Sequence, residues 1–193
     1  MTAYFDTREQ WLMAAVQELE PRFSEAGLSI PAKIKVSCGF GIGARGGKKI
    51  LGQCFSPEVS HSGNTEIFIS PIIDDPLKVI GVLAHQLVHA CIGNDKGHGE
   101  EFKRAGAAVG LWGNASEMLP GAEMHDDIMD NTLPILGTYP HAALDDSKRK
   151  RQTTRLIKCV SASGYSVWTT KKHLDIGYPV DPDGNQCFPK DGD

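Results

Sequence analysis

The sequence predicts an α+β fold, in which helices pack on a small antiparallel sheet and a short β-rich tail follows. Apolar residues repeat at helical spacing in some segments and alternate with polar residues in others. The composition, with 40% hydrophobic and 23% charged residues over 193 positions, suits one globular domain with a small appendage. No Lys or Arg occurs from Ala105 to Ser147, whereas six follow between positions 148 and 158. We therefore expect two parts, residues 1–140 and 141–193.

A first helix and three short strands are expected before residue 71. The helix follows Asp6 or Thr7, either of which can cap it, and ends near Pro21. Alternation of apolar and polar residues predicts strands at 33–37, 50–55 and 65–70. Large apolar residues expected in the core are Trp11, Leu19, Phe102 and Trp112.

The segment from Asp74 to Gly99 carries the most specific pattern. It begins with an expected helix, capped by Asp74 or Asp75 and ended by Gly93. Within that helix stands His85-Gln86-Leu87-Val88-His89. Histidines four positions apart on a helix point the same way, because ~100° per residue brings them about one turn apart. That is the ligand geometry of the zinc-peptidase pattern H-E-x-x-H, with Gln86 in place of the glutamate.

His98 completes a candidate zinc site. It follows a turn at 93–95 and precedes a second expected helix at 100–109. Catalytic zinc usually has three protein ligands, so we predict one Zn²⁺ bound by His85, His89 and His98. The alternative is two helix histidines and a solvated loop histidine, with no metal. The spacing from His89 to His98 is longer than the metzincin pattern allows, which disfavours that group.

These motifs resemble the SprT-like (Spartan-type) metallopeptidases over about residues 5–115. The resemblance rests on the two histidine motifs and on the strands before them: Ile50-Leu-Gly-Gln-Cys-Phe55, Glu66-Ile-Phe-Ile-Ser-Pro71, His85-Gln-Leu-Val-His89, Gly97-His-Gly-Glu-Glu-Phe102 and Ala107-Ala-Val-Gly-Leu111. It implies a zincin-like domain, the same three zinc ligands, and a catalytic base at position 86. It also implies a zinc-dependent endopeptidase that acts on DNA-associated proteins.

Gln86 departs from that family. An amide can form a hydrogen bond with a water molecule but cannot take its proton. Loss of a positioned general base typically costs ~10²–10⁴-fold in rate, so this chain should be inactive or nearly so. Either the natural residue is Glu and Gln was introduced to trap an inactive enzyme, or the chain is a natural pseudoenzyme. The intact ligand set favours the first explanation.

The substrate is expected to be an extended protein or peptide chain. In zinc peptidases a strand at the edge of the sheet commonly binds it by adding it to the sheet. We expect either 51–55 or the strand that contains Glu66, Ile67, Phe68 and Ile69 to have this role. The alternative is that both strands are interior and only structural.

The tail resembles a zinc ribbon that has lost most of its ligands. The segments 158–165 and 179–184 correspond to its two knuckles, with Ser and Asp at most ligand positions, so a second zinc is not expected. We predict a ribbon-like hairpin with 165–168 and Lys171-Lys172 on strands. Its basic residues make DNA a candidate partner, with Trp168 or Tyr165 stacking on bases; the alternative is a solvated linker. The candidate contacts are Lys148, Arg149, Lys150, Arg151, Lys171 and Lys172.

The sequence also bears on location. It has no signal-peptide pattern at the N-terminus and no apolar run of the ~20 residues that a membrane span needs. Its five cysteines, an odd number, are read as reduced thiols. We therefore expect a cytoplasmic protein without membrane contact, associated with the nucleoid if it binds DNA. A non-catalytic zinc-containing module that binds DNA or protein is the alternative function, and a peptidase with substrates unrelated to DNA is a third.

Overall fold

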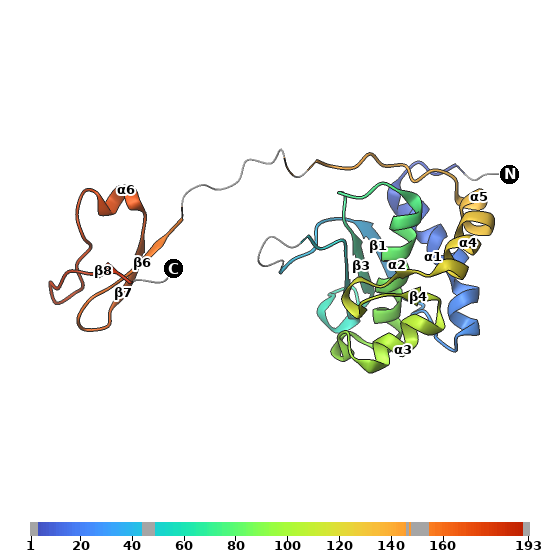
Figure 1. The fold of residues 1–193 in the computed structure, drawn as a ribbon, viewed down its shortest axis with the longest axis horizontal. Coiled ribbons are helices and arrows are strands. Elements are labelled where there is room, and N and C mark those ends of the chain that lie inside the picture. The colour runs from blue at the N-terminus through green and yellow to red at the C-terminus, as the bar shows by residue number, and fades with distance from the viewer. Residues whose placement is uncertain (1–3, 44–48, 146, 148–154, 191–193) are drawn as a thin grey trace. The chain divides into compact units, whose positions relative to one another are not determined.

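The structure is a computed structural model that describes residues 4–43, 49–145, 147 and 155–190. The chain forms two compact units, Met1–Asp146 and Ser147–Asp193, so the division falls slightly after the expected boundary at residue 140 (Figure 1). The basic residues Lys148, Arg149, Lys150 and Arg151 lie outside the described residues. None of the described helices has both the length and the apolar character that a membrane crossing requires.

The first unit begins with α1 (Arg8–Glu25). Thr7 caps it, accepting a hydrogen bond from the Gln10 backbone while the Gln10 side chain binds back to the Thr7 amide. The prediction that the helix ends near Pro21 is wrong, because it continues for four residues beyond. Leu19 and Phe23, on either side of the proline, are both buried in the core, and this burial outweighs the one hydrogen bond that proline cannot form.

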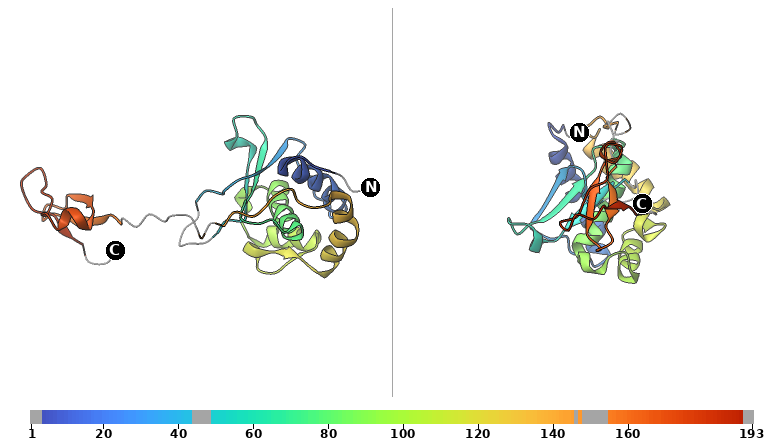
Figure 2. Two further views of the ribbon diagram at one scale, coloured as in Figure 1. Left: turned by 90° about the horizontal axis from the view of Figure 1, so that it is seen from above. Right: turned by 90° about the vertical axis from the view of Figure 1, so that its left-hand side faces the viewer.

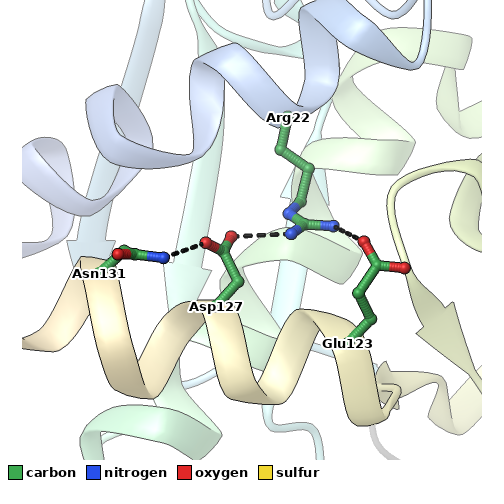
Figure 3. Close-up of polar contacts among 4 residues, drawn as sticks. All are labelled: Arg22, Glu123, Asp127 and Asn131. Carbon is green, nitrogen blue, oxygen red and sulfur yellow. Dashed lines mark hydrogen bonds and ion pairs between the residues drawn. The ribbon is translucent and has the colours of Figure 1, made fainter.

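An ion pair also holds the end of α1 (Figure 3). The Arg22 guanidinium donates to the Asp127 carboxylate at 2.7 Å and lies 3.8 Å from Glu123. Both acids belong to α4 (Ala122–Asp127), which continues through the π-helix η4 (Ile128–Thr132) into α5 (Leu133–Leu136). The pair therefore ties the first helix to a segment about a hundred residues later in the chain.

The sheet of this unit has three strands: β1 (Ile34–Cys38), β2 (Gly52–Phe55) and β3 (Thr65–Ile69). Their order is β1-β3-β2, with β1 parallel and β2 antiparallel to β3. The sheet is thus mixed and not antiparallel as predicted. The long connection from β1 to β3, which itself contains β2, returns the chain to the starting end of β1, and parallel pairing needs such a crossover.

One face of the sheet is covered by helices (Figure 2). Thr65, Ile67 and Ile69 are buried on that face, where α2 (Pro76–Ile92) packs on β2 and β3 while α1 packs on β1. Phe68 points to the other face and meets Phe55 edge to face at 5.7 Å. The helix α2 is capped by Asp75, which accepts from the Lys78 amide at 2.7 Å, as expected.

After α2 the chain builds the other side of the site. It forms the short 3₁₀ turn η2 (Asn94–Lys96), α3 (Glu100–Ala108), and a hairpin of β4 (Leu111–Trp112) and β5 (Leu119–Pro120). Trp112 is 72% exposed and not buried as expected. Strand alternation puts Leu111 in the core and turns the next side chain outward, where the indole lies over Gly121.

The second unit is a small antiparallel sheet of β6 (Ile157–Val160), β7 (Ser166–Thr169) and β8 (Phe188–Pro189), in the order β7-β6-β8. Lys171 and Lys172 lie on the short helix α6 (Lys171–Leu174) and not on a strand. Thr169 pairs with Ile157, the first residue of β6, so β7 has no further residue of β6 to pair with. The chain then turns into α6, where the amides of His173 and Leu174 donate to the Thr170 carbonyl.

Candidate metal centre

The first unit brings His85, His89 and His98 together. The first two are one turn apart on α2 and are buried, at 7% and 9% exposure. His98 comes from the loop between η2 and α3. Two glycines shape that loop, because Gly93 and Gly97 adopt φ values of 93° and 52°, which residues with a side chain rarely do. The resulting turn folds His98 back over the C-terminal half of α2.

The three rings converge through the same atom. The Nε2 of His98 lies 3.2 Å from the Nε2 of His85 and 3.1 Å from that of His89. Among the described residues this is the one group of three or more potential ligand side chains close enough to share a metal ion.

Phe102 forms the floor of this cluster, which sequence reasoning placed only in the core. Its ring, on α3, is completely buried and has its centroid 4.8, 4.3 and 5.0 Å from those of His85, His89 and His98. The sequence offered only the short separation as a signal, because Phe102 follows His98 by four positions while His98 itself precedes α3. One apolar ring therefore fixes all three imidazoles.

The electrostatics favour neutral imidazoles. Burial, together with the neighbouring His98, lowers the pKa of His85 to about 4, and burial with both neighbours lowers the pKa of His89 to about 3. Burial also lowers the pKa of His98. A neutral imidazole carries a free lone pair on one of its two ring nitrogens and can bind a metal ion through it.

These residues fit a metal ion. Three neutral rings that present Nε2 to one point cannot all satisfy one another, since each hydrogen bond between them needs one nitrogen to carry a proton. A divalent cation would accept all three lone pairs at once, and neutral imidazole is a common ligand of transition metals. The arrangement can therefore hold a metal ion.

Gln86 lies beside the cluster and is 7% exposed. Its side chain packs under the backbone of Gly52 on β2: a Cβ at that glycine would lie 2.9 Å from Gln86 Cγ and 2.6 Å from Val82 Cγ1. Gly52 is therefore required for the close approach of β2 to α2 at this point. The Gln86 side chain therefore packs against β2, and in the sequence it directly follows His85.

The strand order distinguishes between the two strands that were expected to bind a peptide, β2 and β3. β3 is the central strand, so the backbone groups of Glu66, Ile67, Phe68 and Ile69 are used by β1 on one side and β2 on the other. The expectation that this strand adds a peptide is wrong for that reason, and Ile67 and Ile69 are also buried. The other candidate strand, β2, has no strand partner on its second side within the described part of the chain.

No family model, no curated protein and no solved structure matches this chain. The interpretation of the site therefore depends on its own geometry.

The nucleic-acid candidates that the structure describes belong to the second unit. Lys171 and Lys172 are exposed on α6 of the second unit. Lys158, also a basic candidate from the sequence, and Trp168 are register partners on β6 and β7, and the Lys158 ammonium lies 5.4 Å from the indole centroid.

Proposed function

We propose that the first unit is a zinc-dependent endopeptidase domain of the SprT-like type. The observation that carries the proposal is the convergence of three neutral histidine Nε2 atoms beside position 86. His85, His89 and His98 would hold the zinc, which when bound supplies a Lewis acid for a peptide carbonyl and for the attacking water. The substrates in this proposal are proteins associated with DNA.

Position 86 governs turnover in this proposal. A carboxylate there would take the proton of the attacking water and pass it to the leaving amine. The Gln86 amide can hold the same water by a hydrogen bond but has no site for its proton. The chain with Gln86 should therefore bind zinc and peptide while cleaving little or nothing.

The free side of β2 would hold the peptide. The Leu51 carbonyl accepts from the Ser70 amide, so residues 51, 53 and 55 point their backbone groups at β3. Gly52 and Cys54 then point theirs away from β3, but the Cys54 carbonyl already accepts a hydrogen bond from the Asn94 side chain, so Gly52 is the residue open to a peptide. An extended peptide pairing with Gly52 would lie over Gln86, which is where the peptide bond must be for proton transfer.

The test is the Gln86→Glu variant with an unfolded protein such as casein as substrate. We expect zinc-dependent cleavage ~10²–10⁴-fold faster than that of the Gln86 chain, abolished by a chelator. Gln86→Ala is the matched control, since it leaves the ligands in place and supplies no base. Equal rates for the Glu, Gln and Ala forms would contradict the proposal.

A second candidate is a non-catalytic binding module, favoured by one face of the second unit. Strand alternation puts Lys158, Trp168 and Phe188 on the same face, and Tyr178 lies against Phe188 with ring centroids 4.9 Å apart. All three aromatic rings are about half exposed. The unit has nine Lys or Arg and five Asp or Glu, a net charge of +4, whereas the whole chain has −4.

Exposed aromatic rings beside basic residues can bind single-stranded nucleic acid by stacking and charge. Fluorescence anisotropy with an oligonucleotide at two salt concentrations tests this. We expect binding that weakens with salt and with Trp168→Ala. If the Gln86→Glu variant binds zinc and DNA but cleaves nothing, the binding-module function is the better account.

A further inference from the structure

A cavity of about 360 Å³ lies next to the metal centre on its His89 side. It is lined by the end of β2, by the turn after it, and by the C-terminal end of α2 with the following loop. The residues that matter for its chemistry are Cys54, Ser56, Glu58, His89, Asn94 and Asp95. Its size is near the lower end of ligand pockets, which span ~300–1,000 Å³, and suits one side chain.

The cavity lies where a side chain of a bound peptide would point. Cys54 pairs with the buried Ile67, so its side chain is on the sheet face that covers α2, the same face as the histidines. A peptide added along β2 would direct every second side chain to that face. The Asn94 side-chain amide donates to the Cys54 carbonyl at 3.0 Å, so the open part of the β2 edge ends at Gly52. The cavity begins at that point, because Cys54 and Asn94 both line it, and a peptide paired with Gly52 would place its next inward side chain there.

The charge of the lining is negative. Glu58 and Asp95 are its two carboxylates, and the residues lining the cavity include no Lys or Arg. A hydrogen bond from Ser56 lowers the pKa of Glu58, which keeps it ionised. Burial raises the pKa of the Cys54 thiol to about 11, so this side chain adds no charge to the cavity. Lys96 outside the cavity is 3.7 Å from Asp95 but is shared with Glu101 at 3.6 Å.

We propose that this cavity is a specificity subsite that receives a Lys or Arg side chain of the substrate, beside the bond to be cleaved. The inference rests on the proposed peptidase function and names its substrate class: extended segments with a basic residue at one fixed position. Basic residues are abundant in proteins that contact nucleic acid, which agrees with the intended substrates.

Binding, not cleavage, is the direct test, because the zinc-loaded Gln86 chain should hold a peptide without consuming it. The probes are short blocked fluorescent peptides in which one position is Lys, Met or Glu, with that position moved along the peptide. At one position we expect Lys to bind about three- to tenfold more tightly than Met, and Glu more weakly, with the difference reduced at high salt. The double variant Glu58→Gln with Asp95→Asn should abolish the preference for Lys. The control Glu25→Gln, which removes an exposed carboxylate of α1 away from the cavity, should leave that preference unchanged.

The outcomes separate the two proposals. Equal affinity for Lys, Met and Glu peptides, or a preference that survives the double variant, would overturn the subsite. If peptides also bind equally while Gln86→Glu cleaves casein, only the subsite fails. If no peptide binds and Gln86→Glu cleaves nothing, the peptidase function fails and the subsite with it.

Discussion

Each unit of this protein holds a polar cluster, and the polar atoms of the two clusters are arranged in opposite ways. In the first unit His85, His89 and His98 direct the same kind of atom at one point, at 3.1–3.2 Å. In the second unit a carboxylate takes the central place. Asp181 is 4% exposed and accepts from the Ser163 hydroxyl at 2.8 Å, the Asn185 amide at 2.8 Å and the Asp183 amide at 3.0 Å.

The direction of the protons explains the contrast. The single Ser163 proton goes to Asp181, so in the 2.8 Å contact between Ser161 and Ser163 the donor must be Ser161. Donors and an acceptor therefore form a closed chain in the second unit. In the first unit three imidazole Nε2 atoms face one another, and a cation could accept the lone pairs of all three. The Ser and Asp side chains of the second unit thus satisfy one another by hydrogen bonds alone.

The largest expected effect that would break this comparison is loss of metal from the first unit. We expect His98→Ala to reduce zinc affinity by more than about 100-fold, because loss of an outer partner of a ligand alone costs ~10–100-fold. Metal content after dialysis, with His125→Ala as a control on an exposed histidine outside the cluster, measures it. Zinc retained at one ion per chain in His98→Ala would show that the three rings are not a metal site.

Phe102 gives the next largest effect. Phe102→Ala should destabilise the first unit by ~3–5 kcal/mol, as removal of a fully buried aromatic side chain does, and should also weaken zinc binding, since the ring contacts all three histidines. Phe102→Leu is the matched variant: it keeps an apolar floor and should restore most of the stability. Urea unfolding with and without zinc separates the two effects. Zinc binding unaffected by Phe102→Ala would mean that the ring only fills the core.

The second unit should respond to Asp181 and not to chelation. Burial raises the pKa of this carboxyl, but hydrogen bonds from Asn185 and Ser163 outweigh burial and hold it well below the ordinary value of 3.8. Its stabilising contribution is therefore complete above pH 3.8 and is lost as the pH falls below that value. We expect Asp181→Ala to remove the amide exchange protection of β6 and β7, which EDTA should leave intact. Protection lost on chelation would instead indicate a metal in this unit.

The local parts of the first unit could be predicted from the sequence. The helix α2, its Asp75 cap and its end at Gly93 are confirmed, because caps and glycines act over a few residues. The meeting of His98 with His85 and His89 was predictable for the same reason, since glycines and one turn of helix bring the loop back.

Strand order and side-chain environment could not be predicted in this way. Whether β3 is central depends on pairing between segments distant in sequence, and alternation is the same for an edge and a central strand. The exposure of Trp112 depends on a two-residue strand that no periodicity reveals. The continuation of α1 past Pro21 depends on Phe23 reaching the core and on Arg22 meeting Asp127, neither of which is local.

The smallest expected effect comes from an exposed carboxylate, Asp127, which can be compared with the buried Asp181. Asp127, like Asp181, accepts several hydrogen bonds, from Arg22 at 2.7 Å and Asn131 at 2.8 Å, but its side chain is 39% exposed (Figure 3). The Arg22 and Asn131 hydrogen bonds lower its pKa below 3.8, so its contribution too is lost as the pH falls below that value. Solvent screening limits the size, and we expect Asp127→Asn to cost no more than about 1 kcal/mol in urea unfolding at pH 7. Glu123→Gln should cost still less stability, because Glu123 is the more distant and more exposed partner of Arg22. A loss above about 1 kcal/mol for Asp127→Asn would mean that the α1–α4 ion pair, and not burial of Phe23, continues the helix past Pro21.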